Sequence, residues 1–247
     1  MISKELISSS TTPKSALDEK AIISVIIPAF NEAKSITHVL NDIPKGLTHE
    51  VVVVNNASKD ETELRAEDAG ATVINEERQG YGYACLKGIE YLKNAEYKPD
   101  IVVFLDADYS DSPDEMDQLV QPIIEDNIDL VIGSRALGNR EKGSMLPQQI
   151  FGNWLATRLM RLFFGGKFTD LGPFRAIKFD KLLAIQMRDK TFGWTVEMQL
   201  KALKYGLTYT EVPISYKKRI GVSKISGTIS GSIKAGYKIL YTIFKYL

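Results

Sequence analysis

The sequence predicts an α/β protein in which helices flank a mostly parallel central sheet. Short runs of apolar, β-branched residues alternate with segments whose apolar residues recur at helical spacing, which is the order that right-handed crossovers between parallel strands require. In the stretch Ile101–Glu115, one such run of apolar β-formers ends in two carboxylates, Asp106 and Asp108, which are separated by a single residue. Ligands of these folds bind beyond the carboxyl ends of the strands. We therefore expect the functional site at that edge of the sheet.

Composition narrows the class of protein. The chain has 247 residues, of which 44% are hydrophobic, enough for one large domain with a substantial core. Its single cysteine, Cys85, excludes an internal disulfide and a zinc site built from several thiolates. No apolar run near the N-terminus is typical of a signal peptide, so a reducing, cytoplasmic location is expected.

The formal charge is balanced, with 31 basic and 31 acidic residues, but it is unevenly distributed. Residues 216–247 contain seven lysines or arginines and no acidic residue. Such a basic segment indicates a negatively charged partner, either phospholipid or a phosphorylated substrate. Nucleic acid is disfavoured, because no nucleic-acid-binding motif accompanies the charge.

The first half of the chain shows the strand–helix alternation clearly. Residues 1–20 are rich in serine and threonine and show no periodicity, which is typical of a flexible leader. Beyond them, buried strands and amphipathic helices are predicted from runs of β-branched residues and from apolar residues three or four apart. The strands are Ile22–Pro28, Glu50–Val54 and Thr72–Asn75, and the helices are Ala33–Ile43, Glu61–Ala69 and Gly82–Leu92.

A glycine-containing turn opens the last of these helices. The pair Gly80 and Gly82 could bring backbone amides to a phosphate at the helix N-terminus. The turn lacks the third glycine of a dinucleotide fingerprint and follows a short strand, so a Rossmann NAD site is excluded.

The pair Asp106 and Asp108 is the strongest chemical signal. Two positions apart in an extended backbone, both side chains should point the same way. Hard oxygen donors in this place favour Mg²⁺ or Mn²⁺ holding a diphosphate. The alternative is a solvated turn before a helix, with Ser112 as N-cap, Pro113 at the first position and Glu115 closing a capping box. Capping leaves the Asp106/Asp108 pair unexplained, so we favour the metal.

The second half continues the pattern. After a helix from about Asp114 to Glu125, a strand at Asp129–Gly133 ends at Ser134 and Arg135. The polar loop 136–146 is expected to be a mobile lid near the site. A helix at Phe151–Phe164, a turn at Thr169–Arg175 and a helix from about Val196 follow, with Glu197 in the first turn, where the helix dipole favours an acid.

The segment from about Thr228 to Leu247 predicts a C-terminal amphipathic helix. Its lysines prevent it from spanning a bilayer, which needs about 20 apolar residues. We expect it to lie on an anionic membrane surface, whereas packing on the domain or on a second subunit, as in a homodimer, is the alternative. The apolar face comprises Ile229, Ile233, Tyr237, Leu240, Phe244 and Leu247, and Lys234, Lys238 and Lys245 lie opposite.

Taken in chain order, these segments resemble the family-2 glycosyltransferases of GT-A fold, in particular the branch around dolichyl- and polyprenyl-phosphate sugar synthases. The resemblance extends from Ile23 to about Lys224 and implies a GT-A type single domain at 21–215, followed by a basic loop and the C-terminal helix at 216–247. Each segment is weak alone, but together they are highly specific. They are VIIPAFNE, VVVVNNASKD, GYGYA, FLDAD, GSR, TDLGPFRAI and FGWTVEM.

The resemblance implies where the nucleotide-sugar donor binds. Asn55 and Asn56 stand where the family usually has an acidic pair that contacts the base. An amide both donates and accepts hydrogen bonds, whereas a carboxylate only accepts. The identity of the donor nucleotide, UDP or GDP, therefore stays undecided, with UDP favoured. Further donor contacts are expected from Pro28, Phe30, Glu32, Gly80, Gly82 and Asp106.

The resemblance also implies the catalytic residues of a hexosyltransferase. Asp106 and Asp108 match the metal motif, where Mg²⁺ or Mn²⁺ stabilises charge on the leaving nucleotide, and Ser110 or Asp111 would complete the shell. Arg135 matches an arginine that grips the acceptor phosphate. Arg140 and Arg175 are expected to support these contacts.

The expected reaction is a single in-line displacement that inverts the anomeric carbon. A polyprenyl or dolichyl phosphate acceptor is already anionic and needs no strong base. A hydroxyl acceptor needs one, and the resemblance implies Glu197 for that role. With a lipid acceptor, the protein would be peripheral on the cytoplasmic membrane face, and Glu197 would orient the sugar.

Two rival classes share parts of the pattern. Aspartyl phosphatases also place D-x-D after an apolar strand, but usually after the first strand and followed by Thr or Val, whereas here Tyr109 and Ser110 follow. A non-catalytic sugar-nucleotide-binding protein would account for Asn55 and Asn56. The presence of Asp106, Asp108 and Arg135 together favours an enzyme.

Overall fold

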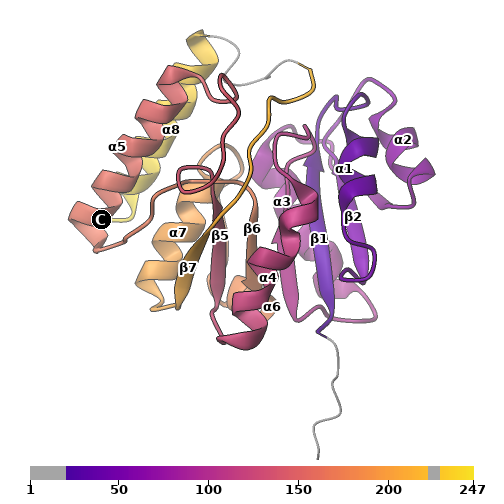
Figure 1. The fold of residues 1–247 in the computed structure, drawn as a ribbon, viewed down its shortest axis with the longest axis horizontal. Helices are drawn as coiled ribbons and strands as arrows, with labels where there is room; N and C mark the ends of the chain where they lie inside the picture. Colours follow the sequence, from indigo (N-terminus) through magenta and orange to yellow (C-terminus); the bar gives the residue numbers. More distant parts are fainter. Residues whose placement is uncertain (1–20, 222–228) are drawn as a thin grey trace, which may run out of the picture.

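The computed structural model describes residues 21–221 and 229–247, with the side chains of 229, 230 and 232 left out. The predicted leader and residues 222–228 of the predicted basic loop lie outside the described residues. One seven-stranded sheet organises the described part (Figure 1). The strands are β1 (Ile23–Ala29), β2 (Glu50–Asn55), β3 (Thr72–Asn75), β4 (Ile101–Phe104), β5 (Leu130–Ser134), β6 (Arg175–Lys178) and β7 (Tyr209–Pro213).

The sheet has the order β3-β2-β1-β4-β6-β5-β7. Its pairs are parallel except those of β6, which runs antiparallel to both β4 and β5. The predicted α/β class with a mostly parallel sheet is therefore confirmed. The chain leaves β1 toward β2 on one side, and β4 joins β1 on the other. That reversal of strand order is where such folds form a ligand crevice.

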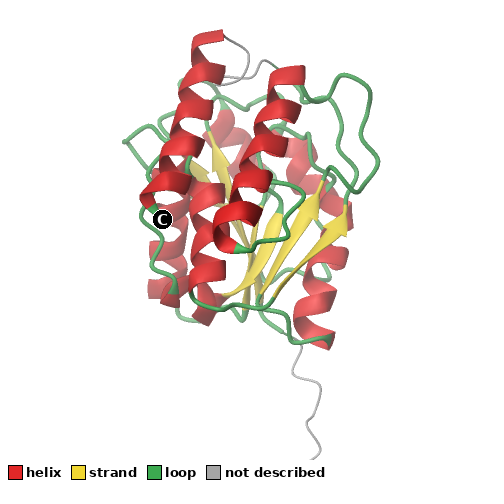
Figure 2. Ribbon diagram, turned by 90° about the vertical axis from the view of Figure 1, so that its left-hand side faces the viewer, coloured by secondary structure: helices red, strands yellow, loops and turns green. Residues whose placement is uncertain are grey.

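Helices cover both faces of the sheet (Figures 1 and 2). The apolar core on one face includes residues of α1, α2 and α4, and that on the other includes residues of α3 and α5 to α8. The helices are α1 (Ile36–Asp42), α2 (Thr62–Asp68), α3 (Tyr81–Asn94), the 3₁₀ turn η1 (Pro113–Glu115), α4 (Met116–Glu125), α5 (Pro147–Phe164), α6 (Phe179–Ala184), α7 (Trp194–Lys204) and α8 (Ile229–Lys245).

The turn after β4 differs from its prediction in two ways. The strand ends at Phe104, so Asp106 and Asp108 lie in a turn and not on extended backbone. The predicted capping box is also wrong, because Ser112 makes no side-chain cap and the Glu115 carboxylate instead accepts the backbone N–H of Ser215 at 2.6 Å. This hydrogen bond joins the end of the turn to the segment that follows β7.

The C-terminal helix α8 has two apolar faces. One packs on the domain: Ile243 is fully buried, and Ile239 and Tyr246 pack against the same core cluster as α5 and α7. Of the face predicted from the sequence, Ile233 and Tyr237 are about two thirds accessible, at 66% and 69%, and Phe244 and Leu247 are also exposed. Leu240 is partly exposed, and the side chain of Ile229 lies outside the described residues. None of the helices in the two described ranges combines the length and hydropathy needed to cross a bilayer.

Candidate active site

A cavity of about 420 Å³ lies beyond the ends of β1 and β4. Pro28 near the end of β1 lines the cavity together with Phe30 and Glu32 of the segment after it, and the turn after β4 supplies Asp106 and Asp108. The opposite wall consists of the loop before α3 and residues 191–192, which precede α7. The predicted donor residues of these two strand ends are therefore brought together. Its other lining residues are Ala29, Asn56, Gln79, Gly80, Tyr81, Ala107, Thr191, Phe192 and Arg219.

The carboxylates after β4 have buried oxygens without hydrogen-bond partners. These are Oδ1 of Asp106 and both carboxylate oxygens of Asp111, which is 1% exposed. Burial, followed by the nearby charge of Asp108, raises the pKa of Asp106 to about 7. Burial and the charges of Asp106 and Asp108 likewise raise the pKa of Asp111 well above its usual range. Unpaired acceptors of this kind are costly, and a bound cation or donor group would satisfy them.

Arg219 places a positive charge between two of the acids. Its guanidinium lies 3.1 Å from Oδ2 of Asp108 and 3.0 Å from Oε1 of Glu32. The backbone N–H of Ile220 donates to the carbonyl of Asp108, and that of Lys217 donates to the carbonyl of Ser110. The segment 216–221 therefore lies across the cavity as a strap. Arg219 of the strap therefore neutralises the negative charge of Asp108.

The residues fit a divalent metal held jointly with a ligand. Among the described residues, no group of three or more His, Cys, Asp or Glu side chains is arranged to hold a metal ion by itself. Mg²⁺ commonly takes only one or two carboxylates and completes its shell with water and substrate phosphates. Asp108, which the Arg219 cation already contacts, and the unpaired Oδ1 of Asp106 suit that arrangement.

Asn55 and Asn56 point to different surroundings. The Asn55 amide donates to Glu63 and Asn75 and does not line the cavity. Asn56 lines it, but its amide donates to the carbonyls of Glu76 and Arg78. The Asn56 Oδ1 accepts the N–H of Gly80. Asn56 thus orders the loop before α3, and the structure does not bring Asn55 to the predicted base site.

The glycine turn serves a close approach of two backbones. A Cβ on Gly82 would lie 2.1 Å from the carbonyl oxygen of Asp189, and one on Gly80 would lie 2.4 Å from that of Lys190. Gly80 has a φ of +151°, a conformation that glycine adopts readily. Gly80 lines the cavity whereas Gly82 does not. Packing against residues 189–190 accounts for both glycines.

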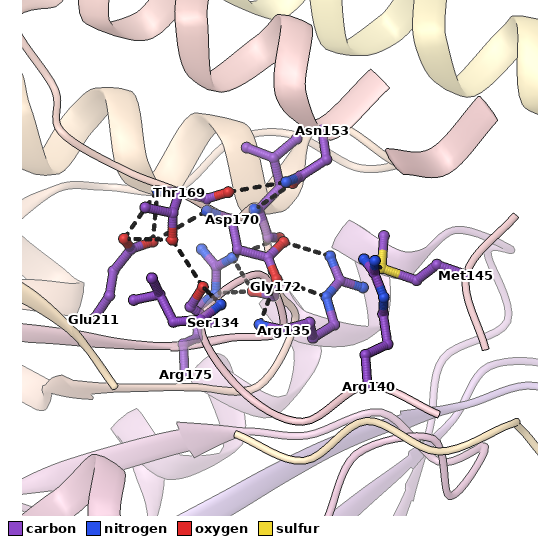
Figure 3. Close-up of polar contacts among 12 residues, drawn as sticks. Ser134, Arg135, Arg140, Met145, Asn153, Thr169, Asp170, Gly172, Arg175 and Glu211 are labelled. Atoms are coloured by element: carbon purple, nitrogen blue, oxygen red, sulfur yellow. Dashed lines mark hydrogen bonds and ion pairs between the residues drawn. The ribbon is translucent and has the colours of Figure 1, made fainter. Parts of the chain in front are cut away.

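Arg135 is held by a bidentate ion pair (Figure 3). Its Nε and a terminal nitrogen lie 2.8 and 2.6 Å from the two oxygens of Asp170. The backbone N–H groups of Thr169 and Asp170 donate in turn to Glu211 of β7. Burial opposes the charge of Arg135, but the charge of Asp170 and its hydrogen bonds raise the arginine pKa overall. An arginine has five N–H donors, so this fixed guanidinium can still bind a ligand.

A second cavity of about 320 Å³ extends from the carboxylate turn to the C-terminal helix. Asp106, Asp108 and Arg135 line it together with Arg219 and Tyr216 of the strap. Its remaining wall is largely apolar or small and comes from α5, α7, α8 and the turn before β6. These residues include Gly152, Leu171, Pro173, Trp194, Ala235, Gly236 and Ile239.

Glu197 and Arg175 lie away from both cavities. The Glu197 carboxylate accepts the N–H groups of Arg188 and Asp189 and the Tyr246 hydroxyl, and it pairs with Lys201 at 2.9 Å. Burial acts to raise the Glu197 pKa, but these hydrogen bonds lower it overall. These contacts argue against a role as base.

Arg175 is fully buried and donates to the backbone carbonyls of Leu171, Gly172 and Thr195. Figure 3 shows Arg175 beside Gly172. Burial lowers its pKa to about 10. Arg175 therefore orders the turn that carries Asp170, and its side chain lines neither cavity.

Several residues of the site were missed in the sequence. The sequence pattern did not single out Arg219 and Tyr216 of the strap, Asp170 behind Arg135, or Thr191 and Phe192 of the first cavity. The signal that pointed to the strap was its run of basic residues, Lys217, Lys218 and Arg219.

A family model described as glycosyl transferase family 2 matches residues 24–185, which is more than half of the chain. The chain belongs to glycosyl transferase family 2. The predicted enzyme class, a hexosyltransferase, is confirmed by this family and by the named relatives of the chain. The non-catalytic and phosphatase alternatives are accordingly set aside.

Relatives of this glycosyltransferase match it over most of their own length. The undecaprenyl-phosphate mannosyltransferase of Micrococcus luteus is 30% identical over 221 residues, covering 85% of this chain and 89% of that protein. The UDP-N-acetylglucosamine–dolichyl-phosphate N-acetylglucosaminyltransferase of Methanococcus voltae is 29% identical over 244 residues, covering 90% and 94%. The resemblance to the polyprenyl-phosphate sugar synthase branch is confirmed.

Solved structures confirm the GT-A-like fold of this glycosyltransferase. The glucosyl-3-phosphoglycerate synthase of Mycobacterium tuberculosis, in complex with Mn²⁺, UDP and phosphoglyceric acid, has a TM-score of 0.72 at 21% identity. The match covers 92% of this chain and 78% of that one. The same enzyme with Mg²⁺ and UDP has a TM-score of 0.69 at 20% identity and covers 92% and 79%.

Proposed function

We propose that this glycosyltransferase moves a sugar from a UDP-sugar to the phosphate of a polyprenyl or dolichyl phosphate. The cavity between the carboxylate turn and α8 carries this proposal, because its lining changes in character along its length. Asp108, Arg135 and Arg219 give it a charged end, and Gly236 and Ile239 of α8 give it an apolar end. A lipid phosphate has the same two parts. A small sugar acceptor would have no use for the apolar end.

The chemistry needs no base from the protein. An acceptor phosphate is already anionic at neutral pH, so its oxygen can attack the anomeric carbon directly. The bond from that carbon to the donor diphosphate breaks, and its electron pair leaves with UDP. Arg135, fixed by Asp170, holds and orients the attacking phosphate. The engagement of Glu197 by four donors supports this acceptor over a hydroxyl.

The donor would bind in the cavity beyond β1 and β4. Asp108 would hold Mg²⁺ or Mn²⁺, with Asp106 contacting the metal or the ribose. When bound, the metal supplies positive charge to the diphosphate as it leaves. Arg219 would turn from Asp108 to the diphosphate and neutralise it from the strap side.

The names of related proteins and the ligands of similar structures support the proposed donor, acceptor and metal. Two relatives are named for undecaprenyl-phosphate and dolichyl-phosphate acceptors, and one of these names includes a UDP-sugar. The structures of similar fold hold UDP with Mn²⁺ or Mg²⁺.

The exposed face of α8 supports contact with an anionic membrane surface, on the cytoplasmic side. Tyr237 and Phe244 are 69% and 53% exposed, and Phe244 lies 6.0 Å, ring to ring, from Phe163 of α5. The patch continues along α5 through Phe151 and Leu162, both more than 60% exposed. Exposed apolar surface on this scale marks an interaction site, and a lipid acceptor would be presented there.

The substrate assignment is tested in two steps. UDP- and GDP-sugars are first screened with Mn²⁺ for a rise in melting temperature, since a ligand that binds only the native state must raise it. Transfer is then measured to a short-chain polyprenyl phosphate and to the corresponding polyprenol. Transfer to the phosphate alone is expected, and transfer to the alcohol alone would contradict the proposal.

A cavity-filling variant probes the apolar end. A Cβ at Gly236 would meet no atom within 4 Å, so Gly236→Trp can fill the cavity without a backbone clash. We expect the KM for the lipid phosphate to rise about tenfold or more, which corresponds to about 1.4 kcal/mol, with donor binding unchanged. Tyr237→Trp, on the exposed face beside it, is the matched control. Equal KM values for both variants would refute the assignment of this cavity.

Membrane contact is tested on the exposed face, so that α8 remains packed. The variant Ile233→Ser/Tyr237→Ser/Phe244→Ser should lose co-sedimentation with anionic vesicles, and high salt should weaken binding of the original protein. Unchanged sedimentation would rule out this face. A concentration-dependent dimer that the variant abolishes would assign the face to a second copy instead.

A further inference from the structure

A third cavity, of about 370 Å³, lies between α5 and the loop after β5. Met145 and Asn153 line both this cavity and the second cavity, to which the acceptor is assigned and which is called the acceptor cavity below, so they separate the two. Neither Asp106 nor Asp108 lines it. Three arginines do, namely Arg140, Arg158 and Arg161.

The positive charge of this cavity is not compensated by the protein. None of the three arginines forms an ion pair with another residue in the described ranges. The acid in the lining is Asp170, and both of its oxygens are taken by Arg135 (Figure 3). Asp170 is also 1% exposed and therefore poorly placed to attract a further cation. The cavity thus has an excess of positive charge.

The helix α5 presents two of these arginines together. Arg158 and Arg161 are three residues apart, a spacing that puts side chains on the same side of a helix. The Arg158 guanidinium lies 5.9 Å from the ring centre of Trp154, which also lines the cavity. The wall itself is fixed, because Asn153 donates to the carbonyl of Thr169 and accepts the N–H of Leu171.

We propose that Arg140, Arg158 and Arg161 bind a phosphate group in this cavity, in addition to the acceptor phosphate assigned to Arg135. Guanidinium groups match the geometry of phosphate oxygens and bind them through paired hydrogen bonds. The rim favours a phospholipid headgroup over free phosphate as the source. Trp154 and Phe151 are 51% and 61% exposed there, and tryptophan and other aromatic side chains favour the headgroup level of a bilayer.

The test compares Arg158→Gln/Arg161→Gln with a control that loses the same charge elsewhere. Lys45→Gln/Arg65→Gln serves, because both residues are exposed and lie outside this cavity. In one arm, co-sedimentation is measured with phosphatidylglycerol–phosphatidylcholine vesicles and with phosphatidylcholine alone. In the other, the melting temperature is measured with inorganic phosphate and with glycerol 3-phosphate. Mn²⁺–UDP stabilisation reports that the donor site remains intact.

We expect the Arg158→Gln/Arg161→Gln variant to partition about tenfold or more weakly onto the anionic vesicles, while the control does not, as two basic residues near the surface would predict. Loss of stabilisation by soluble phosphate without loss of vesicle binding would keep the phosphate site and assign it to a free ligand. Behaviour equal to the control in both arms would overturn the proposal. Loss of transferase activity with retained anion binding in both arms would likewise overturn the proposal, and it would assign the two arginines to the transfer reaction instead.

Discussion

The metal ion proposed at Asp108 would compete with Arg219 for the same carboxylate, so two variants are expected to have opposite effects on metal binding. Replacing Asp108 by Asn removes a carboxylate charge with little change of size. We expect turnover to fall at least about a hundredfold, roughly 3 kcal/mol of transition-state stabilisation, and Mn²⁺ affinity to fall with it. Replacing Arg219 by Gln frees the same carboxylate. The donor-free protein should then bind Mn²⁺ more tightly.

The size of the second effect follows from the ion pair. Arg219 contacts Asp108 and Glu32 at 3.1 and 3.0 Å, with its side chain 27% exposed. A partly exposed pair of this kind contributes about 1 kcal/mol, so its removal should raise Mn²⁺ affinity about fivefold. Calorimetric titration of Mn²⁺ without donor measures both changes. Unaltered Mn²⁺ binding by Asp108→Asn would refute the metal site, and unaltered binding by Arg219→Gln would refute the competition.

Three further predictions concern Arg135, Glu197 and Arg175. Arg135→Ala should reduce the rate of transfer to a lipid phosphate at least about a hundredfold, whereas Glu197→Gln should reduce that rate less than about tenfold per folded molecule. If steady-state assays show the reverse order, a hydroxyl acceptor would be favoured. Glu197 should also stabilise the fold in a pH-dependent way. The pKa of Glu197 is lower in the folded protein than its usual value, so the stability that its charge contributes is fully present above the unfolded pKa and is lost as the pH falls through the folded pKa. The melting-temperature gap between the original protein and Glu197→Gln should therefore be widest near neutral pH and narrow below about pH 4; a constant gap would show that the charge is irrelevant. Arg175→Met should leave buried carbonyls unpaired and lower the free energy of unfolding by about 3 kcal/mol, which urea denaturation would measure, and an unchanged midpoint would contradict the positioning role.

The predictable parts of the site are those in which the functional side chains lie in the sequence at or just after the end of a strand. Asp106 and Asp108 follow closely after β4, Pro28 lies near the end of β1, and Phe30 and Glu32 follow β1. Parallel strands bring such ends to one edge, so sequence order alone predicts that they meet. The strand assignments rested on the same simple pattern. Two strands depart from it, because β6 runs antiparallel to its neighbours and β7 was not predicted.

The parts that were not predictable depend on contacts between distant segments. Glu197 has the sequence features of a base, but its environment is set by Tyr246, 49 residues later. Asn55 and Asn56 are adjacent in sequence, but only Asn56 lines the donor cavity. Arg219 reaches Glu32 across 187 residues, and nothing in the basic run of the strap distinguishes it from Lys217 or Lys218.

The strap connects the two halves of the reaction and so bears on the order in which substrates bind. Tyr216 lies 5.0 Å below the Arg135 guanidinium, and it is joined by backbone hydrogen bonds to Asn139 and Glu141 of the loop beside the acceptor cavity. Arg219, three residues later, contacts Asp108. In the proposed donor complex Arg219 would turn from Asp108 to the diphosphate, and the same short segment would then adjust beneath Arg135. Initial-rate kinetics should therefore show a compulsory order, with the donor first and UDP leaving last.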